Sequence, residues 1–144
     1  MATKTLTGAC LCGKITYALD LPASEPNPKL VLCHCTSCKR YTGSGFSTNI
    51  MIPKSALRWT SGTPKVFLDS SADSGNALPR EICGDCGSHF TSGPSGSPTI
   101  ALKWGTLDDE YRQGAELWGE IYCKRKDAWL ESVGKGEVRM AGMS

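Results

Sequence analysis

Three cysteines within six residues, Cys33, Cys35 and Cys38, constrain the fold of this chain more than any other feature. An extended chain advances by only about 3.5 Å per residue, so one small turn brings the three sulfurs around a single point. A tetrahedral ion held by three sulfurs still lacks one ligand. Structural zinc sites are normally closed by four protein ligands, whereas catalytic sites keep a position open. The cluster therefore predicts a metal site with room for an incoming ligand.

The other cysteines form two close pairs and one isolated residue: Cys10 and Cys12, Cys83 and Cys86, and Cys123. Cysteines this close in sequence rarely bridge each other but readily share a metal. The first residues, Met1–Thr7, lack the apolar stretch of a secretory signal. Disulfide frameworks are typical of short secreted chains, so metal binding is favoured over disulfides and a cytoplasmic location is expected.

Two zinc ions ligated only by cysteine need about eight thiolates, and the three clusters supply seven. One division of the thiols gives a closed structural site and leaves Cys33, Cys35 and Cys38 as the open one. The closed site would then contain Cys10, Cys12, Cys83 and Cys86. Spacing alone does not decide this, because exchanging the pairs gives the same count.

Three further residues are candidates to close the second site. His34 lies between two ligands, so its side chain is expected to point away from an ion that they share. His89 follows the last cysteine pair and is expected to hydrogen-bond locally or to orient a ligand. Cys123 lies in an apolar segment, where a free cysteine behaves as a small hydrophobic residue.

Length and composition indicate one globular domain. The chain has 144 residues, with 40% hydrophobic and 21% charged residues. A net charge of +2 is too small to indicate nucleic acid or a membrane surface as a partner, and no apolar run is long enough for a transmembrane helix. We expect a single zinc-binding domain over residues 5–133 and a flexible tail over 134–144. The sequence assigns no oligomeric state.

Alternating apolar and polar residues predict β-structure in most of the chain. Strands are expected over 15–19, 29–32, 46–52, 99–104 and 116–123, and one helical turn over 107–113. Segments 56–59 and 65–68 flank a Thr-Ser-Gly turn and are interpreted as a hairpin. No long segment has a helical period, so the predicted class is mainly β, with cysteine knuckles joining antiparallel sheets.

Six motifs follow one another in a specific order between about Gly8 and Trp129. They are Gly8–Gly13 (GACLCG), Cys33–Cys38 (CHCTSC), Trp59–Gly62 (WTSG), Cys83–Ser88 (CGDCGS), Gly105–Asp108 (GTLD) and Lys126–Trp129 (KDAW). In these motifs the sequence resembles the glutathione-dependent formaldehyde-activating enzymes, to which the centromere protein V group is related. The resemblance implies a β-tent fold, as in methionine sulfoxide reductase B and a Rab exchange factor. It also implies structural zinc on Cys10, Cys12, Cys83 and Cys86 and catalytic zinc on Cys33, Cys35 and Cys38, and it gives Cys123 no role.

The implied activity is a zinc-dependent carbon–sulfur lyase with glutathione as co-substrate and a small-molecule glutathione adduct as substrate. Lys39 and Arg40 follow the three-cysteine cluster and are expected to bind the carboxylates of glutathione, with Arg80 and Lys103 as further candidates. Phe46, Trp59 and Trp104 are candidates to wall the pocket. The alternatives are a non-catalytic zinc module that binds a protein partner and a thiol oxidoreductase that uses Cys123.

Overall fold

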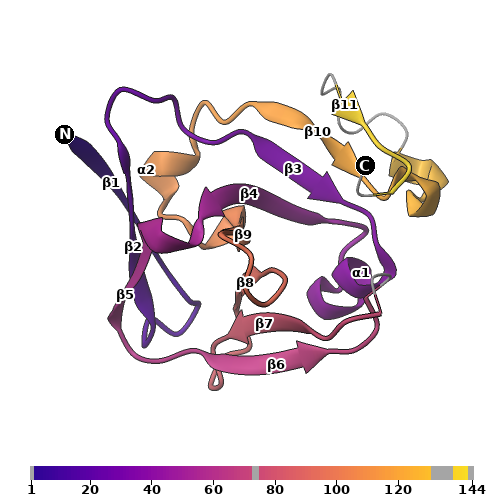
Figure 1. Cartoon of the computed structure of the whole chain (residues 1–144), viewed down its shortest axis with the longest axis horizontal. Helices are drawn as coiled ribbons and strands as arrows, with labels where there is room; N and C mark the ends of the chain where they lie inside the picture. The colour runs from indigo at the N-terminus through magenta and orange to yellow at the C-terminus, as the bar shows by residue number, and fades with distance from the viewer. Residues whose placement is uncertain (1, 73–74, 131–137, 143–144) are drawn as a thin grey trace.

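The computed structural model describes residues 2–72, 75–130 and 138–142, which form two β-sheets linked by short helices (Figure 1). The small sheet has the order β1 (Thr3–Ala9), β2 (Thr16–Pro22), β5 (Leu57–Ser61). The large sheet has the order β11 (Val138–Arg139), β10 (Leu117–Ile121), β3 (Leu30–Cys33), β4 (Ser47–Pro53), β9 (Thr99–Lys103), β8 (His89–Ser92), β7 (Leu78–Ile82), β6 (Lys65–Asp69). The helical segments are α1 (Thr36–Thr42), α2 (Asp109–Arg112), η1 (Lys54–Ala56), η2 (Trp104–Thr106), η3 (Cys123–Arg125) and η4 (Ala128–Leu130).

The predicted mainly β class with cysteine knuckles is confirmed, and the sheets are not wholly antiparallel. Strand β10 runs parallel to both β3 and β11, whereas the other strand pairs are antiparallel. The helical turn expected over 107–113 is present as α2. Helix α1 and strand β1 were not predicted, because α1 is only seven residues long and β1 (TKTLTGA) has no regular alternation of apolar and polar residues.

In β4 and β9 of the large sheet, successive side chains point to opposite sides, one apolar and one polar. Ile50 and Leu102 lie in the hydrophobic core, which also contains Tyr17 of the small sheet. Their strand neighbours Asn49 and Lys103, which are paired across β4 and β9, are also buried but belong to the opposite face. Burial of polar groups on that face requires partners for each of them, and it is this face that carries the candidate site.

The predicted hairpin over 56–59 and 65–68 is wrong. Strand β5 pairs with β2 of the small sheet, and β6 pairs with β7 of the large sheet. The turn between them crosses from one sheet to the other at Gly62, which has φ +69°. A Cβ atom at Gly62 would lie 2.7 Å from the carbonyl oxygen of Lys14 and 2.8 Å from Ile15, so only glycine fits.

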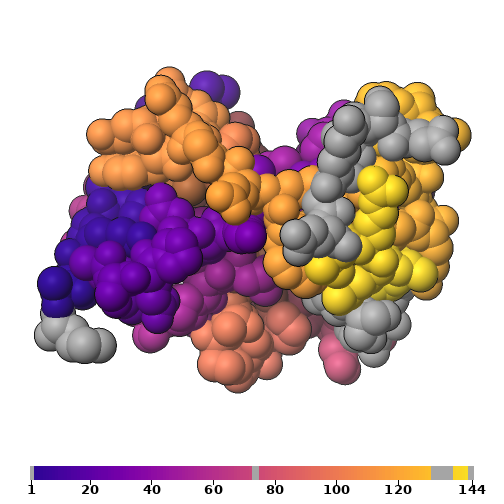
Figure 2. All heavy atoms as spheres, turned by 90° about the horizontal axis from the view of Figure 1, so that it is seen from above, coloured from indigo at the N-terminus to yellow at the C-terminus, as the bar shows by residue number. Residues whose placement is uncertain are grey.

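The C-terminal segment lies at the end of the molecule away from the N-terminal sheet, as the yellow and indigo atoms show in Figure 2. Of the predicted tail, residues 134–137 and 143–144 lie outside the described residues. Val138 and Arg139 form β11 and pair with Gly119 and Glu120. In the part of the chain that the structure describes, no helix is long and apolar enough to cross a membrane.

Candidate metal centres

Four cysteines from two distant turns meet at one point. The sulfurs of Cys10, Cys12, Cys83 and Cys86 lie within 4.8 Å of one another. The Cys10 and Cys12 sulfurs are 3.6 Å apart, and those of Cys12 and Cys83 are 3.8 Å apart. Zinc–sulfur bonds of about 2.3 Å in a tetrahedron place the sulfurs about 3.8 Å from each other. The cluster therefore fits a closed tetrahedral ion, and the structure groups these four thiols apart from Cys33, Cys35 and Cys38.

The backbone of the two turns is shaped around these sulfurs. Gly13 has φ +77°, a conformation that glycine adopts without strain, and it closes the turn that carries the first two cysteines. The backbone N–H of Ile15 donates to Cys10 Sγ over 3.4 Å, a contact that favours the thiolate form. The two turns are joined by a hydrogen bond of 2.9 Å from the Leu11 N–H to Ser88 Oγ.

The second cluster is formed where β3 runs into α1. Cys33 ends the strand, Cys35 caps the helix, and Cys38 lies in its first turn; their sulfurs lie within 4.8 Å of one another. Cys35 Sγ accepts a hydrogen bond of 3.2 Å from the Cys38 N–H, so a sulfur takes the place of the usual oxygen cap. Among the residues that the structure describes, no further histidine, cysteine or carboxylate joins this group.

The three thiols are close enough to compete for protons. Hydrogen bonds with Cys35 and then Cys38 raise the pKa of Cys33, and burial raises it further. Hydrogen bonds with Cys33 and Cys35 lower the pKa of Cys38, and Ser47 and the charge of Lys103 act in the same direction. A soft divalent cation replaces such shared protons, because it binds thiolates rather than thiols. The donor set and its spacing thus fit zinc.

None of the three candidates for a fourth ligand joins the cluster. His34 points away from it, as predicted: its Nε2 donates to Glu120 Oε1 over 2.8 Å, and both side chains are fully buried. The His89 ring packs against Tyr41, with the ring centroids 4.5 Å apart. Cys123 begins η3, and its N–H donates to the Met140 carbonyl.

A cavity of about 500 Å³ has Tyr41, Phe46, Ser47, His89 and Lys103 in its wall, and none of the three cysteines lines it directly. Tyr41 and Ser47 both interact with Cys38, which connects the cavity to the sulfurs. Phe46 is therefore a wall residue, as expected. The other predicted aromatics lie elsewhere: Trp59 packs edge-on against Phe90 in the core, and Trp104 lines a separate cavity of about 490 Å³.

The comparisons with known proteins agree with this geometry. The sequence model of the family described as "Glutathione-dependent formaldehyde-activating enzyme" matches residues 5–125. The chain belongs to this family. A crystal structure of a Rhodobacter sphaeroides protein, a structural genomics target, is similar in fold to this family member. It has 15% sequence identity and a TM-score of 0.56 over 78% of this chain and 99% of that chain. No curated protein matches the sequence.

Lys103 is the buried cation of this family member that faces the three thiols. It is 7% exposed, and its ammonium group donates to Asn49 Oδ1 over 2.6 Å and to Ser92 Oγ over 3.0 Å. Burial and the charge of Arg80 lower the pKa of Lys103, while the thiols of the cluster oppose this change, and the net result is a pKa of about 8. Positive charge is thus built into the polar face of the sheet beside the sulfurs.

The two cations adjacent in sequence are placed differently. The Lys39 ammonium group donates to Asp127 Oδ1 over 2.8 Å and to the carbonyl of Arg125, and Arg40 is exposed on α1. Their role in binding glutathione stays a prediction. Sequence reasoning missed Tyr41, although its helical spacing of three residues from Cys38 puts both on one helix face.

Proposed function

We propose that this family member is a zinc-dependent carbon–sulfur lyase that acts on glutathione adducts. The adduct is S-hydroxymethylglutathione or the conjugate of a larger electrophile. One observation carries the proposal: three sulfurs, without a fourth ligand among the described residues, lie beside Tyr41 and Ser47, which line a cavity of about 500 Å³. Cavities of this size are typical of small-molecule sites. A cytoplasmic location is part of the same proposal.

Cys10, Cys12, Cys83 and Cys86 would hold a structural zinc ion, and Cys33, Cys35 and Cys38 a catalytic one. Bound in the second cluster, zinc would supply a Lewis acid that lowers the pKa of an incoming thiol. Three thiolates with one dication carry a net charge of −1, which becomes −2 when a substrate thiolate joins. Lys103 lies buried beside these sulfurs, and its charge offsets part of this excess.

The reaction needs no oxidant or reductant. In the synthetic direction the glutathione sulfur bonds to the carbonyl carbon, and the thiol proton ends on the carbonyl oxygen; in the lyase direction the carbon–sulfur bond breaks and the proton returns. In this proposal Tyr41 assists the proton exchange. Its hydroxyl group is buried, and Ser47 and Cys38 lie beside it. Burial raises the pKa of Tyr41, so the hydroxyl stays protonated and can donate to a substrate oxygen.

The test uses Cys35→Ser, with Cys123→Ser as the matched control outside both clusters. Zinc content is measured together with exchange between S-hydroxymethylglutathione and free formaldehyde above the uncatalysed rate. We expect Cys35→Ser to lose one of two zinc equivalents and at least about 100-fold in rate, and Cys123→Ser to retain both. Unchanged exchange in Cys35→Ser would exclude the mechanism. A wild-type protein that binds two zinc ions but accelerates no adduct reaction would favour the non-catalytic zinc module.

A further inference from the structure

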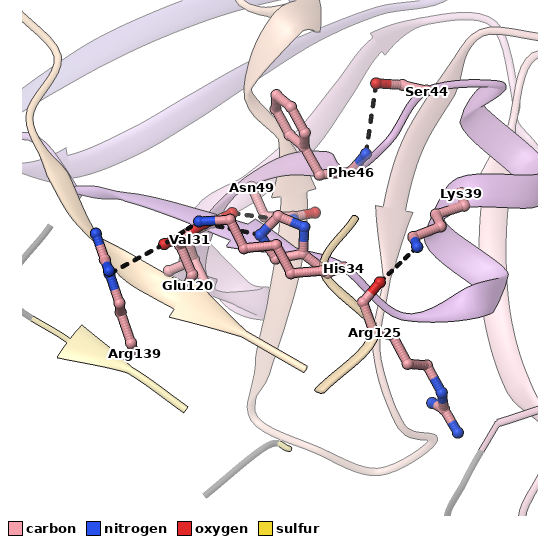
Figure 3. A network of polar contacts seen from close by, with 10 residues as sticks. Val31, His34, Lys39, Ser44, Phe46, Asn49, Glu120, Arg125 and Arg139 are labelled. Atoms are coloured by element: carbon pink, nitrogen blue, oxygen red, sulfur yellow. Dashed lines mark hydrogen bonds and ion pairs between the residues drawn. The ribbon is translucent and has the colours of Figure 1, made fainter. Parts of the chain in front are cut away.

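A fully buried carboxylate, Glu120 of β10, lies at the centre of the polar network in Figure 3. Its Oε1 accepts a hydrogen bond of 2.8 Å from His34 Nε2 and lies 3.0 Å from the ammonium group of Lys126. Its Oε2 lies 3.4 Å from Arg139 Nε. A buried carboxylate is costly unless it is paired, so the position of Glu120 and the positions of its partners depend on one another.

The network reaches the three-cysteine cluster through His34, which lies between Cys33 and Cys35 in the chain. His34 is attached to β10 at two points, because its backbone N–H also donates to the Ile121 carbonyl over 3.1 Å. A residue that is fixed at both its backbone and its ring cannot rotate freely. The two cysteines on either side of it are therefore held in one relative orientation.

The C-terminal part of the chain also contacts helix α1, which follows Cys35 in the chain. Lys39, which directly follows Cys38, bonds to Asp127 and to the Arg125 carbonyl. Lys126, between these two residues, bonds to Glu120. Residues 125–127 thus contact both Glu120, which bonds to His34 just before Cys35, and helix α1, which follows Cys35. The four-cysteine cluster is anchored differently, by its own turns and by the bond between Leu11 and Ser88.

We infer that Glu120 is a positioning residue for the three-cysteine site. Through His34 it holds residues 33–38 in the orientation that binds metal, and Lys126 and Arg139 hold Glu120 in turn. Metal retention in this site therefore depends on the C-terminal segment, whereas retention in the four-cysteine site does not. This inference concerns metal binding and does not require that the proposed lyase activity be correct.

The test measures zinc release from the full-length, zinc-loaded protein to a chromogenic chelator, and Cys35→Ser identifies the phase that belongs to the three-cysteine site. Glu120→Gln removes the charge while keeping the size of the side chain. We expect it to accelerate that phase by at least tenfold and to change the other phase by less than twofold. The matched control is Glu116→Gln, just before β10, where the side chain is 72% exposed and pairs with Lys29. It should change neither phase.

If Glu120→Gln does not fold, Lys126→Ala replaces it, because this variant leaves the bond between His34 and Glu120 in place; we expect a three- to fivefold acceleration of the same phase. Unchanged release in folded Glu120→Gln would overturn the positioning role. Equal acceleration of both phases would overturn it too, because a general loss of stability would explain that result. If the wild-type protein released zinc in a single phase, there would be no separate metal site on the three cysteines, and the proposed function would fail with it.

Discussion

The two cysteine clusters use the same ligand atom in different surroundings. The four-cysteine cluster lies at the edge of the core: Cys10 and Cys83 are buried, and Cys12 is exposed. Leu11 beside it is 89% exposed, and the neighbouring ion pair between Lys14 and Asp85 has side chains that are 68% and 63% exposed. The three-cysteine cluster lies between α1 and the buried polar face of the large sheet, where Lys103 is 7% exposed. Water around the first cluster weakens the electrostatic effect of nearby side-chain charges on its sulfurs. At the second cluster, burial preserves the effect of the Lys103 charge on the sulfurs.

This difference indicates that the task of each metal site follows from ligand number and surroundings together. Four ligands at the edge of the core join two distant parts of the chain and leave no position for a substrate. Three ligands beside a buried cation and a cavity keep a position open and supply the charge that an anionic ligand requires.

The largest expected effect separates the folding roles of the clusters. Cys83 is 1% exposed, belongs to the hydrophobic core and joins the two turns, so Cys83→Ser should prevent folding or lower Tm by more than about 10 °C. Cys35→Ser should lower Tm by less than about half as much. Circular dichroism melts at matched zinc stoichiometry measure both. Equal losses of Tm would show that both clusters are structural.

The next effect concerns the buried charge. Lys103→Met keeps the length of the side chain and removes its charge beside the sulfurs. Zinc affinity of the three-cysteine site should fall by about tenfold or more, and that of the four-cysteine site should not change. Competition with a fluorescent zinc chelator measures both affinities. Lys54→Met, at an exposed position in η1, is the control. An unchanged affinity in Lys103→Met would mean that the thiolates do not need this charge.

A smaller effect, measured as a function of pH, concerns the ion pair between Asp69 and Arg80. Asp69 Oδ2 accepts a hydrogen bond of 2.9 Å from Arg80, whose guanidinium group lies 4.3 Å from the centroid of the Tyr41 ring. Burial raises the pKa of Asp69, but bonds from Ser71 and Arg80 outweigh it and lower the pKa from 3.8 to about 2. The ionised form is therefore favoured in the folded state. Its contribution, on the order of 2 kcal/mol, is present above about pH 4 and is lost as the pH falls towards 2.

Urea unfolding of the wild type and of Asp69→Asn between pH 3 and pH 6 measures this contribution. The difference in unfolding free energy should be constant above about pH 5 and should narrow below about pH 4. A difference that stays constant down to pH 3 would show that the ion pair between Asp69 and Arg80 does not stabilise the wall of the cavity.

Much of this comparison was predictable from the sequence, because metal ligands a few residues apart are local features. Spacing alone did not group Cys10 and Cys12 with Cys83 and Cys86, since the grouping depends on contacts such as the one between Leu11 and Ser88, 77 residues apart. It was the family resemblance that implied it. Periodicity predicts a strand but not its partner, which is why the supposed hairpin proved to be two strands in different sheets.

The charged residues of the site show the same limit. Lys39 and Arg40 were chosen because they follow Cys38 in the chain, but a helix turns successive side chains in different directions. Lys103, which was also a candidate from the sequence, lies beside the cluster because β9 pairs with β4, where Lys103 is opposite Asn49. Helix α1 was missed because its cap is the sulfur of Cys35, and cap rules search for oxygen-bearing side chains.

The smallest expected effect completes the comparison. Lys14 and Asp85 connect the two turns of the four-cysteine cluster through an ion pair of 3.0 Å, and hydrogen bonding to Asp85 raises the pKa of Lys14. Both side chains are exposed, so solvent screens the pair, and holding two long side chains in one geometry costs entropy. Lys14→Ala should therefore leave the urea midpoint and zinc release from this cluster unchanged within error. Suppose that Lys14→Ala weakened zinc binding at the four-cysteine cluster as much as Lys103→Met does at the three-cysteine cluster. The effect of a charge on nearby sulfurs would then not depend on whether the charge is buried.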